Sequence, residues 1–370
     1  MRFSTVFLII GGLVFSFFAG KISGVQQNQT IELQKEAMFY TKLDKKRVVC
    51  ELCPRHCVIE SGKRGFCRNR ENREGILYSV VYNHPCSMGV EPIEKAPFYH
   101  FLPGTMRLTL ATAGCNQQCK YCQNWELSQS SMEDLQNYYL TPEQVIKASQ
   151  EQNLKIICFT YTEPMVFYEY MYDIAVLAKK AGIKTAVVSG GFVNTEPLKK
   201  ICKVVDAIKI DLKGFDETFY RDVCGSELAP VLNACKTIKN SGVHLELVNL
   251  VVPSLNDDTN KIKAMCLWIK EYLGTDVPIH FSRFFPQYKL QNLPPTPISI
   301  LEKAVKIAQN EGLKYVYIGN VPGHKNDNTY CPDCHKLLIK RQGYSIIENN
   351  LIKNKCKFCS SEIDGVFATE

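Results

Sequence analysis

The sequence has no low-complexity tract and no strong internal repeat in its 370 residues, and its apolar fraction is an ordinary 45%. These absences exclude repeat arrays and low-complexity chains, and the length allows one large domain with small appendages. Concentrated positive charge is also missing. The net charge of +7 is spread thinly among lysine-rich segments, so a basic groove for nucleic acid is not indicated.

Cysteine, in contrast, is abundant, with 17 residues. Reactive thiolates suit a reducing compartment, where disulfides are rare, so we interpret most of these cysteines as metal ligands. Three groups have ligand spacing: Cys50, Cys53, Cys57 and Cys67; Cys115, Cys119 and Cys122; Cys331, Cys334, Cys356 and Cys359. Five others are interpreted as small apolar fillers of helices and strands: Cys158, Cys202, Cys224, Cys235 and Cys266.

The middle group has the spacing C-x3-C-x2-C and follows an apolar run, residues 108–112, that reads as a buried strand ended by Gly114. Three thiolates in a short loop can hold one face of an iron–sulfur cluster. A four-iron cluster with three protein ligands keeps one iron open for another molecule. From the spacing alone, the alternatives are a zinc knuckle with its fourth ligand elsewhere, or three free buried cysteines.

The block Ala113-Gly-Cys-Asn-Gln-Gln-Cys-Lys-Tyr-Cys-Gln-Asn-Trp-Glu126, with aromatic Tyr121 before the third cysteine, resembles the radical S-adenosylmethionine (radical SAM) enzymes. It looks like the branch of AmmeMemoRadiSam system enzymes, which are related to pyruvate formate-lyase activating enzymes. The resemblance runs from about residue 50 to residue 366. It implies that a [4Fe–4S] cluster on Cys115, Cys119 and Cys122 binds the amine and carboxylate of SAM. The reduced cluster then cleaves SAM to methionine and a 5′-deoxyadenosyl radical, which abstracts hydrogen from an unknown substrate.

The same resemblance implies an electron donor such as flavodoxin or ferredoxin, and a Memo-type partner protein. Homolytic hydrogen abstraction needs no general base, so the lack of a clear acid–base pair does not argue against an enzyme. Two alternatives stay open: a glycyl-radical activating enzyme acting on a partner protein, and a membrane-tethered electron-transfer protein without SAM chemistry. A zinc-ribbon protein that binds nucleic acid is disfavoured by the diffuse charge.

From residue 107 short β-branched runs alternate with helical patterns, which predicts parallel strands with right-handed crossovers. We therefore expect an α/β fold whose residues 105–325 form a partial (β/α) barrel of the radical SAM type. Catalytic residues of such barrels gather at the carboxyl ends of the strands. Strands are expected near residues 107–112, 155–161, 184–189, 207–212, 244–252, 278–284 and 314–318. Helices are expected near residues 141–151, 167–181, 195–202, 228–241, 258–273 and 298–311.

Candidate SAM ligands stand at these strand ends. The resemblance assigns Glu163, in Thr160-Tyr-Thr-Glu-Pro164, to the SAM amino group, although the family more often has Gly-Gly-Glu-Pro there. Ser189 is a candidate for the SAM carboxylate. Asp211 and Lys213 share one face of a strand. Lys213 would offset the SAM carboxylate and Asp211 would orient the ribose or hold Lys213, with a purely structural ion pair as the alternative.

Two further residues enter through the resemblance. His280 is expected to contact the ribose or adenine, with a packed core histidine as the alternative, and Tyr121 is expected to flank the adenine. Asn249 and Asn256 are interpreted as turn residues. Tyr78 to Tyr82 reads as a short strand, and residues 91–104 read as a loop that leads to the first barrel strand.

The outer cysteine groups each offer four thiolates. The first lies in residues 47–104, a knuckle and connector, where structural zinc is favoured and a second iron–sulfur cluster or no metal are the alternatives. The second has the paired C-x2-C spacing of a zinc ribbon over residues 326–370. Cys331-Pro-Asp-Cys-His335 also matches a C-x-x-C-H haem motif. The second cysteine pair favours the ribbon with Zn²⁺, because haem attachment needs no such pair.

The N-terminus is the one long apolar segment. Residues 3–20 carry no charge, which fits either a signal peptide or a marginal membrane helix. Bulky Phe18 before Ala19 makes a poor cleavage site. Export would separate the enzyme from SAM and reductant, so the sequence favours an uncleaved membrane anchor over residues 1–21 and a cytoplasmic catalytic part, with export as the alternative. Residues 22–46 are expected to form a polar linker with some helix.

Overall fold

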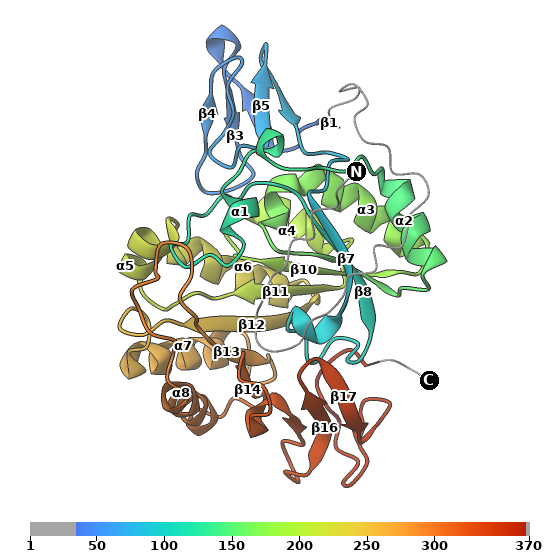
Figure 1. Ribbon diagram of the computed structural model, residues 1–370, viewed down its shortest axis with the longest axis vertical. Helices are drawn as coiled ribbons and strands as arrows, with labels where there is room; N and C mark the ends of the chain where they lie inside the picture. Colours follow the sequence, from blue (N-terminus) through green and yellow to red (C-terminus); the bar gives the residue numbers. More distant parts are fainter. Residues whose placement is uncertain (1–34, 368–370) are drawn as a thin grey trace, which may run out of the picture.

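The computed structural model describes residues 35–367 of the chain. Its centre is an eight-stranded sheet whose strands follow the chain order from β7 to β14 (Figure 1). Strands β8 to β14 run parallel, and β7 pairs with β8 in the antiparallel direction. Among the described strands β7 and β14 stand at opposite edges and do not pair. The sheet is therefore the expected partial barrel.

The predicted barrel elements are present with small shifts at their ends. The strands are β8 (Met106–Ala111), β9 (Ile156–Phe159), β10 (Lys184–Ser189), β11 (Ala207–Asp211), β12 (His244–Val251), β13 (Ile279–Arg283) and β14 (Val316–Gly319). The main connecting helices are α2 (Pro142–Glu151), α3 (Tyr168–Lys180), α4 (Thr195–Cys202), α6 (Leu228–Asn240), α7 (Thr259–Tyr272) and α8 (Ile298–Asn310). Their local signals explain the agreement. All of β9 is buried, and α2 begins at a capping box in which Thr141 and Gln144 bond each other's backbone, followed by Pro142.

The connector before the first parallel strand differs from the prediction. Residues 87–92 form strand β7 (Ser87–Pro92), so the expected loop over residues 91–104 begins inside a strand. The sequence did not predict this strand because glycine and proline, here Gly89 and Pro92, are unfavourable in strands. The strand forms at the edge of the sheet, where proline is tolerated. The strand expected from Tyr78 to Tyr82 lies earlier, as β6 (Ile76–Ser79).

The N-terminal module consists of two small antiparallel sheets. One joins β1 (Lys35–Glu36), β6 and β5 (Arg70–Arg73), and the other joins β2 (Tyr40–Lys42), β3 (Val48–Cys50) and β4 (Val58–Ile59). The structure thus places β1 and β2 in residues assigned to a linker, because their backbones pair with β6 and β3. A buried ion pair between Arg70 and Glu169 of α3 joins the module to the barrel.

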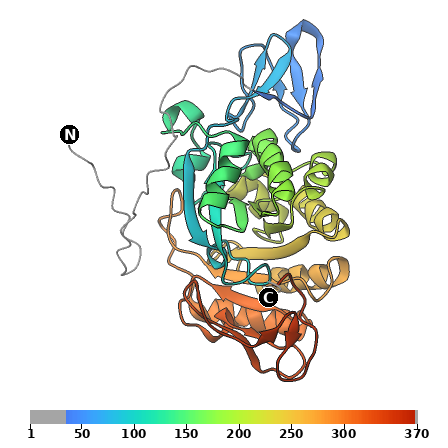
Figure 2. The ribbon, with the colours of Figure 1, turned by 90° about the vertical axis from the view of Figure 1, so that its right-hand side faces the viewer.

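The C-terminal module contains β15 (Thr329–Tyr330), β16 (Leu337–Gln342) and β17 (Ser345–Asn349) in one sheet, and β18 (Leu351–Ile352) with β19 (Lys355–Cys356) in another. In both views this module and the N-terminal module lie at opposite ends of the molecule (Figure 1 and Figure 2). The two outer cysteine groups are therefore separated by the barrel.

No helix within residues 35–367 has the length and apolar character needed to cross a membrane. The anchor expected over residues 1–21, and most of the expected linker, lie outside the described residues.

Candidate active site and metal centres

The three cysteines of the C-x3-C-x2-C group lie in the loop that leaves the carboxyl end of β8, and we call residues 113–124 the cluster loop. Its start needs glycine: Gly114 has a φ of +87°, and a Cβ there would lie 2.4 Å from the carbonyl oxygen of Cys67. Cys119 is buried and Cys115 and Cys122 are half-buried. Burial raises the pKa of the Cys115 and Cys122 thiols. A bound cation would have to stabilise the thiolate forms, because thiolates and not thiols ligate metals.

Cys224 is buried in the core as predicted, and it also lies beside this loop. Its carbonyl oxygen is 3.9 Å from the Cys119 sulfur, and its own sulfur is 3.5 Å from the Tyr121 hydroxyl. The Gln118 and Lys120 amides bond the backbone carbonyls of Cys224 and its neighbour. The segment after β11 therefore supports the cluster loop. Helical spacing alone could not reveal this contact.

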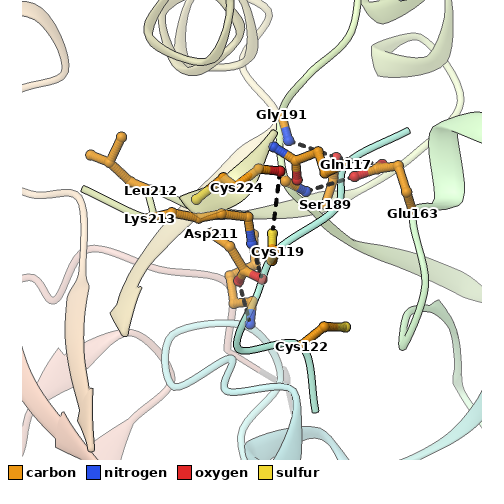
Figure 3. A network of polar contacts seen from close by, with 12 residues as sticks. Gln117, Cys119, Cys122, Glu163, Ser189, Gly191, Asp211, Leu212, Lys213 and Cys224 are labelled. Atoms are coloured by element: carbon orange, nitrogen blue, oxygen red, sulfur yellow. Dashed lines mark hydrogen bonds and ion pairs between the residues drawn. The ribbon is translucent and has the colours of Figure 1, made fainter. Parts of the chain in front are cut away.

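Glu163 and Ser189 form the core of a polar network next to the cluster loop (Figure 3). The carboxylate of Glu163 accepts hydrogen bonds from the Ser189 hydroxyl (2.7 Å), the Gly190 amide (2.8 Å) and the Met165 amide (3.1 Å). Burial raises the pKa of Glu163, although these donors and the charge of Lys213 oppose the shift. Ser189 thus bonds the residue predicted to be its fellow SAM ligand.

Gly190 permits a close approach between β10 and the cluster loop. A Cβ on Gly190 would lie 2.1 Å from the side-chain oxygen of Gln117. The Gln117 amide in turn donates to the Ser226 hydroxyl at 2.8 Å. The glycine is therefore needed for space, not only for the turn after Ser189.

Asp211 and Lys213 lie together as predicted, and a third residue joins them. Asp211 is 3.2 Å from the ammonium of Lys209 and 3.6 Å from that of Lys213. Burial opposes ionisation, but the two lysines hold the pKa of Asp211 below its usual value. The side chains of Asn249 and Asn256 donate to the carbonyls of Leu212 and Lys213 at 2.8 and 2.7 Å, so both asparagines position this strand end.

His280 is not brought to this network. It is the second residue of β13, and its Nε2 lies 2.9 Å from the carboxylate of Glu246 in β12. Its ring packs on Tyr99 and Tyr317 with centroid separations of 4.7 and 4.9 Å. Asp327 of the C-terminal module contacts Tyr99 on the same side. His280 therefore belongs to the packing between barrel and ribbon, the alternative that the sequence left open.

The four cysteines of the C-terminal group, Cys331, Cys334, Cys356 and Cys359, come together as predicted, and we call them the ribbon tetrad. Sulfur separations are 3.6 Å for Cys331 and Cys359 and 3.7 Å for Cys334 and Cys356. All four ligand atoms lie within 4.8 Å of one another. A tetrahedral ion with metal–sulfur bonds of about 2.3 Å fits this spacing.

The sequence missed several residues of the site. Gln117 and Cys224 fill the spaces between elements that are distant along the chain, and Lys209 pairs with Asp211 from within the same strand. No sequence signal marks these three residues. At Tyr161, where the resembled motif has glycine, the structure shows a φ of +66°. A bulky residue in that region is strained, and such strain often marks a functional position.

The chain is similar to several known proteins. The radical SAM superfamily domain matches residues 109–265. An uncharacterized protein of Methanocaldococcus jannaschii is 47% identical over 332 residues, covering 89% of this chain and 99% of the relative. The pyruvate formate-lyase-activating enzyme of Clostridium pasteurianum is 24% identical over 210 residues, covering 52% of this chain and 84% of the relative. A crystal structure of a domain of the pyruvate-formate lyase-activating enzyme from Bacteroides vulgatus matches with a TM-score of 0.40 and 18% identity, covering 44% of this chain and 98% of that one.

Proposed function

The chain belongs to the radical SAM superfamily, and we propose that it cleaves SAM reductively to produce a 5′-deoxyadenosyl radical for hydrogen abstraction. The observation that carries the proposal is the convergence of the cluster loop, Glu163 and Lys213 at the carboxyl ends of the barrel strands. A [4Fe–4S] cluster on Cys115, Cys119 and Cys122 would supply the electron and an open iron. The electron itself would come from a protein such as flavodoxin or ferredoxin.

The chain's own residues would bind and orient the amino-acid end of SAM. Glu163 is an acceptor already held by three donors, so it offers an ammonium a carboxylate of fixed position. Lys213 offers a carboxylate its positive charge. Burial works against that charge, yet the neighbouring Cys119 and Asp211 raise the pKa of Lys213 well above its usual value and keep it cationic. Tyr121, whose ring lies 6.2 Å from that of Phe219 and nearly parallel to it, would form part of the adenine side.

The test is SAM cleavage by the anaerobically reconstituted, reduced protein. We expect 5′-deoxyadenosine and methionine in equal amounts by mass spectrometry, and neither product from the C115A/C119A/C122A variant. An electron-transfer protein without SAM chemistry would reduce and reoxidise without forming either product, which would overturn the proposal.

An activating role is the second candidate, and the similarity to a pyruvate formate-lyase-activating enzyme favours it. In that case the hydrogen donor would be a glycine of a partner protein. Incubation with SAM deuterated at the 5′ carbon and with candidate partners would separate the two: a persistent organic radical on the partner supports activation, and deuterium exchange into a small molecule supports the alternative.

A further inference from the structure

The four cysteines of the N-terminal module are spread more widely than those of the ribbon. Cys50 ends β3, Cys53 and Cys57 follow in the turn before β4, and Cys67 precedes β5; all four line one cavity. Among residues 35–367, however, the ribbon tetrad is the one group of three or more potential ligands whose atoms lie within 4.8 Å of one another. A single zinc ion holds its four thiolates about 3.8 Å apart, given bonds of about 2.3 Å.

The cluster loop shows how far apart the sulfur atoms of a proposed four-iron site lie in the same structure. Cys115, Cys119 and Cys122, whose family uses them on a four-iron cluster, also fall outside the 4.8 Å grouping within the part of the chain that is described. A cuboidal cluster separates its ligands because each thiolate binds a different iron. The N-terminal tetrad therefore resembles the cluster loop in spread, and the ribbon resembles a zinc site.

The cavity places two arginines beside its thiols, and one of them, Arg70, is also paired with Glu169. Its lining includes apolar Leu52, Ile59 and Phe66 together with two arginines. The Arg70 guanidinium is buried and lies 3.9 Å from the Cys50 sulfur. The Arg55 guanidinium stacks on Phe66 at 3.5 Å. Four metal-bound thiolates carry a net negative charge, and buried charge requires such compensation.

The module also touches the cluster loop directly. Asn69 donates to the carbonyl of Ala113 at 2.7 Å, and the Cys67 carbonyl packs against Gly114. Arg55 donates to the backbone oxygen of Asn116 at 2.7 Å, and Asn116 lines the cavity itself. The N-terminal cysteine group and the cluster loop are therefore in direct contact, and Asn116 of the loop lines the cavity of the four cysteines.

We propose that Cys50, Cys53, Cys57 and Cys67 hold a second [4Fe–4S] cluster, in place of the zinc ion that their sequence spacing favours. With four thiolate ligands this cluster has no open iron, so it binds no SAM. Its position against the cluster loop makes it a one-electron carrier, not a second SAM site.

Metal and sulfide content of the anaerobically purified, reconstituted wild-type chain tests the proposal. Two clusters and one ribbon zinc predict about eight iron, about eight acid-labile sulfide and about one zinc per chain. About four iron with about two zinc would place zinc in the N-terminal tetrad and overturn the proposal. About four iron with about one zinc would leave the tetrad without metal and overturn it equally.

Variants separate the two clusters. The C115A/C119A/C122A variant should keep about four iron and a reduced-state paramagnetic resonance signal that SAM does not alter. Adding C53A and C57A to this variant should remove the remaining iron and the signal. The control change C235A/C266A, in buried cysteines outside every group, should remove neither the iron nor the signal when added to the same variant. Complete loss of iron from the triple variant would overturn the proposal. SAM cleavage is measured separately on the wild type, so failure of the proposed function does not mimic failure of this inference.

Discussion

The hydroxyl of Ser189, at the end of β10, lies 2.7 Å from a carboxylate oxygen of Glu163, which follows β9. This bond joins neighbouring strand ends and fixes the carboxylate beside the cluster loop. If Glu163 binds SAM as proposed, Ser189 would act through it, and the two residues should respond as a unit to substitution.

Glu163→Gln should weaken SAM binding while iron content stays intact. The amide has one acceptor oxygen, so its NH2 must face either the Gly190 or the Met165 amide, both of which are donors. Loss of a charge-assisted contact costs about 1.5–3 kcal/mol, or about ten- to a hundredfold in affinity. Calorimetric titration with SAM measures the change. Exposed Glu126, close in sequence to the cluster loop, provides the control as Glu126→Gln; equal affinity for both variants would contradict the role of Glu163.

Lys213→Met should lower SAM affinity by a similar factor of about ten to a hundred. The fold should survive, because Asp211 keeps Lys209 at 3.2 Å as its ion-pair partner. Thermal unfolding and SAM titration together measure the two effects. A variant that unfolds early but binds SAM normally would assign Lys213 to the fold alone.

Gly190→Ala should disturb the cluster loop. The added methyl group would lie 2.1 Å from the Gln117 oxygen, so Gln117 must move. Overpacking typically costs about 1–3 kcal/mol. Gln117→Ala removes the obstructing side chain, and we expect the double variant to recover iron content and SAM cleavage relative to Gly190→Ala. No recovery would show that the glycine serves another purpose.

His100 should make stability depend on pH. Its Nδ1 lies 2.6 Å from the Asp364 carbonyl and its Nε2 lies 2.5 Å from the Tyr317 hydroxyl, so the neutral ring donates to the carbonyl and accepts from the hydroxyl. Burial lowers its pKa from 6.5 to about 4. As the pH falls, His100 therefore takes up its proton in the unfolded chain before it does so in the folded chain. The stability that the neutral ring contributes to folding is complete above about pH 6.5 and is lost as the pH falls toward 4. It amounts to about 3 kcal/mol.

His100→Asn removes that titration and should reduce the fall in unfolding free energy between pH 6.5 and pH 4, as measured by urea unfolding; buried His280, whose pKa is also lowered, keeps part of the slope. Exposed His56, changed to Asn, is the matched control. An unchanged slope for His100→Asn would contradict the assignment.

Cys334→Ala with Cys356→Ala should remove about one zinc per chain and leave iron unchanged, since the ribbon and the cluster loop lie in different parts of the molecule. Elemental analysis measures both metals. Hydrogen exchange should increase in β16 and β19 but not in β8. Loss of iron together with zinc would mean that the ribbon supports the cluster loop.

Most of the barrel was predictable because its signals are local. The apolar run of β9, the capping box of α2 and the C-x3-C-x2-C spacing each act within a few residues. Strand β7 was missed because its identity depends on pairing with β8, which is a contact with another segment. The strands β1 and β2 were missed for the same reason.

The sequence by itself determined the order of strands and helices, the three cysteine groups and the strand ends that carry Glu163, Ser189, Asp211 and Lys213. Only the tertiary structure decided which residues meet across the barrel. It placed His280 beside Glu246 and away from Glu163 and Ser189, brought Cys224 to the cluster loop, and spread the N-terminal tetrad more widely than the ribbon tetrad. The reason is physical: local patterns set φ, ψ and burial, whereas distances between ligand atoms arise from packing of segments far apart in the chain.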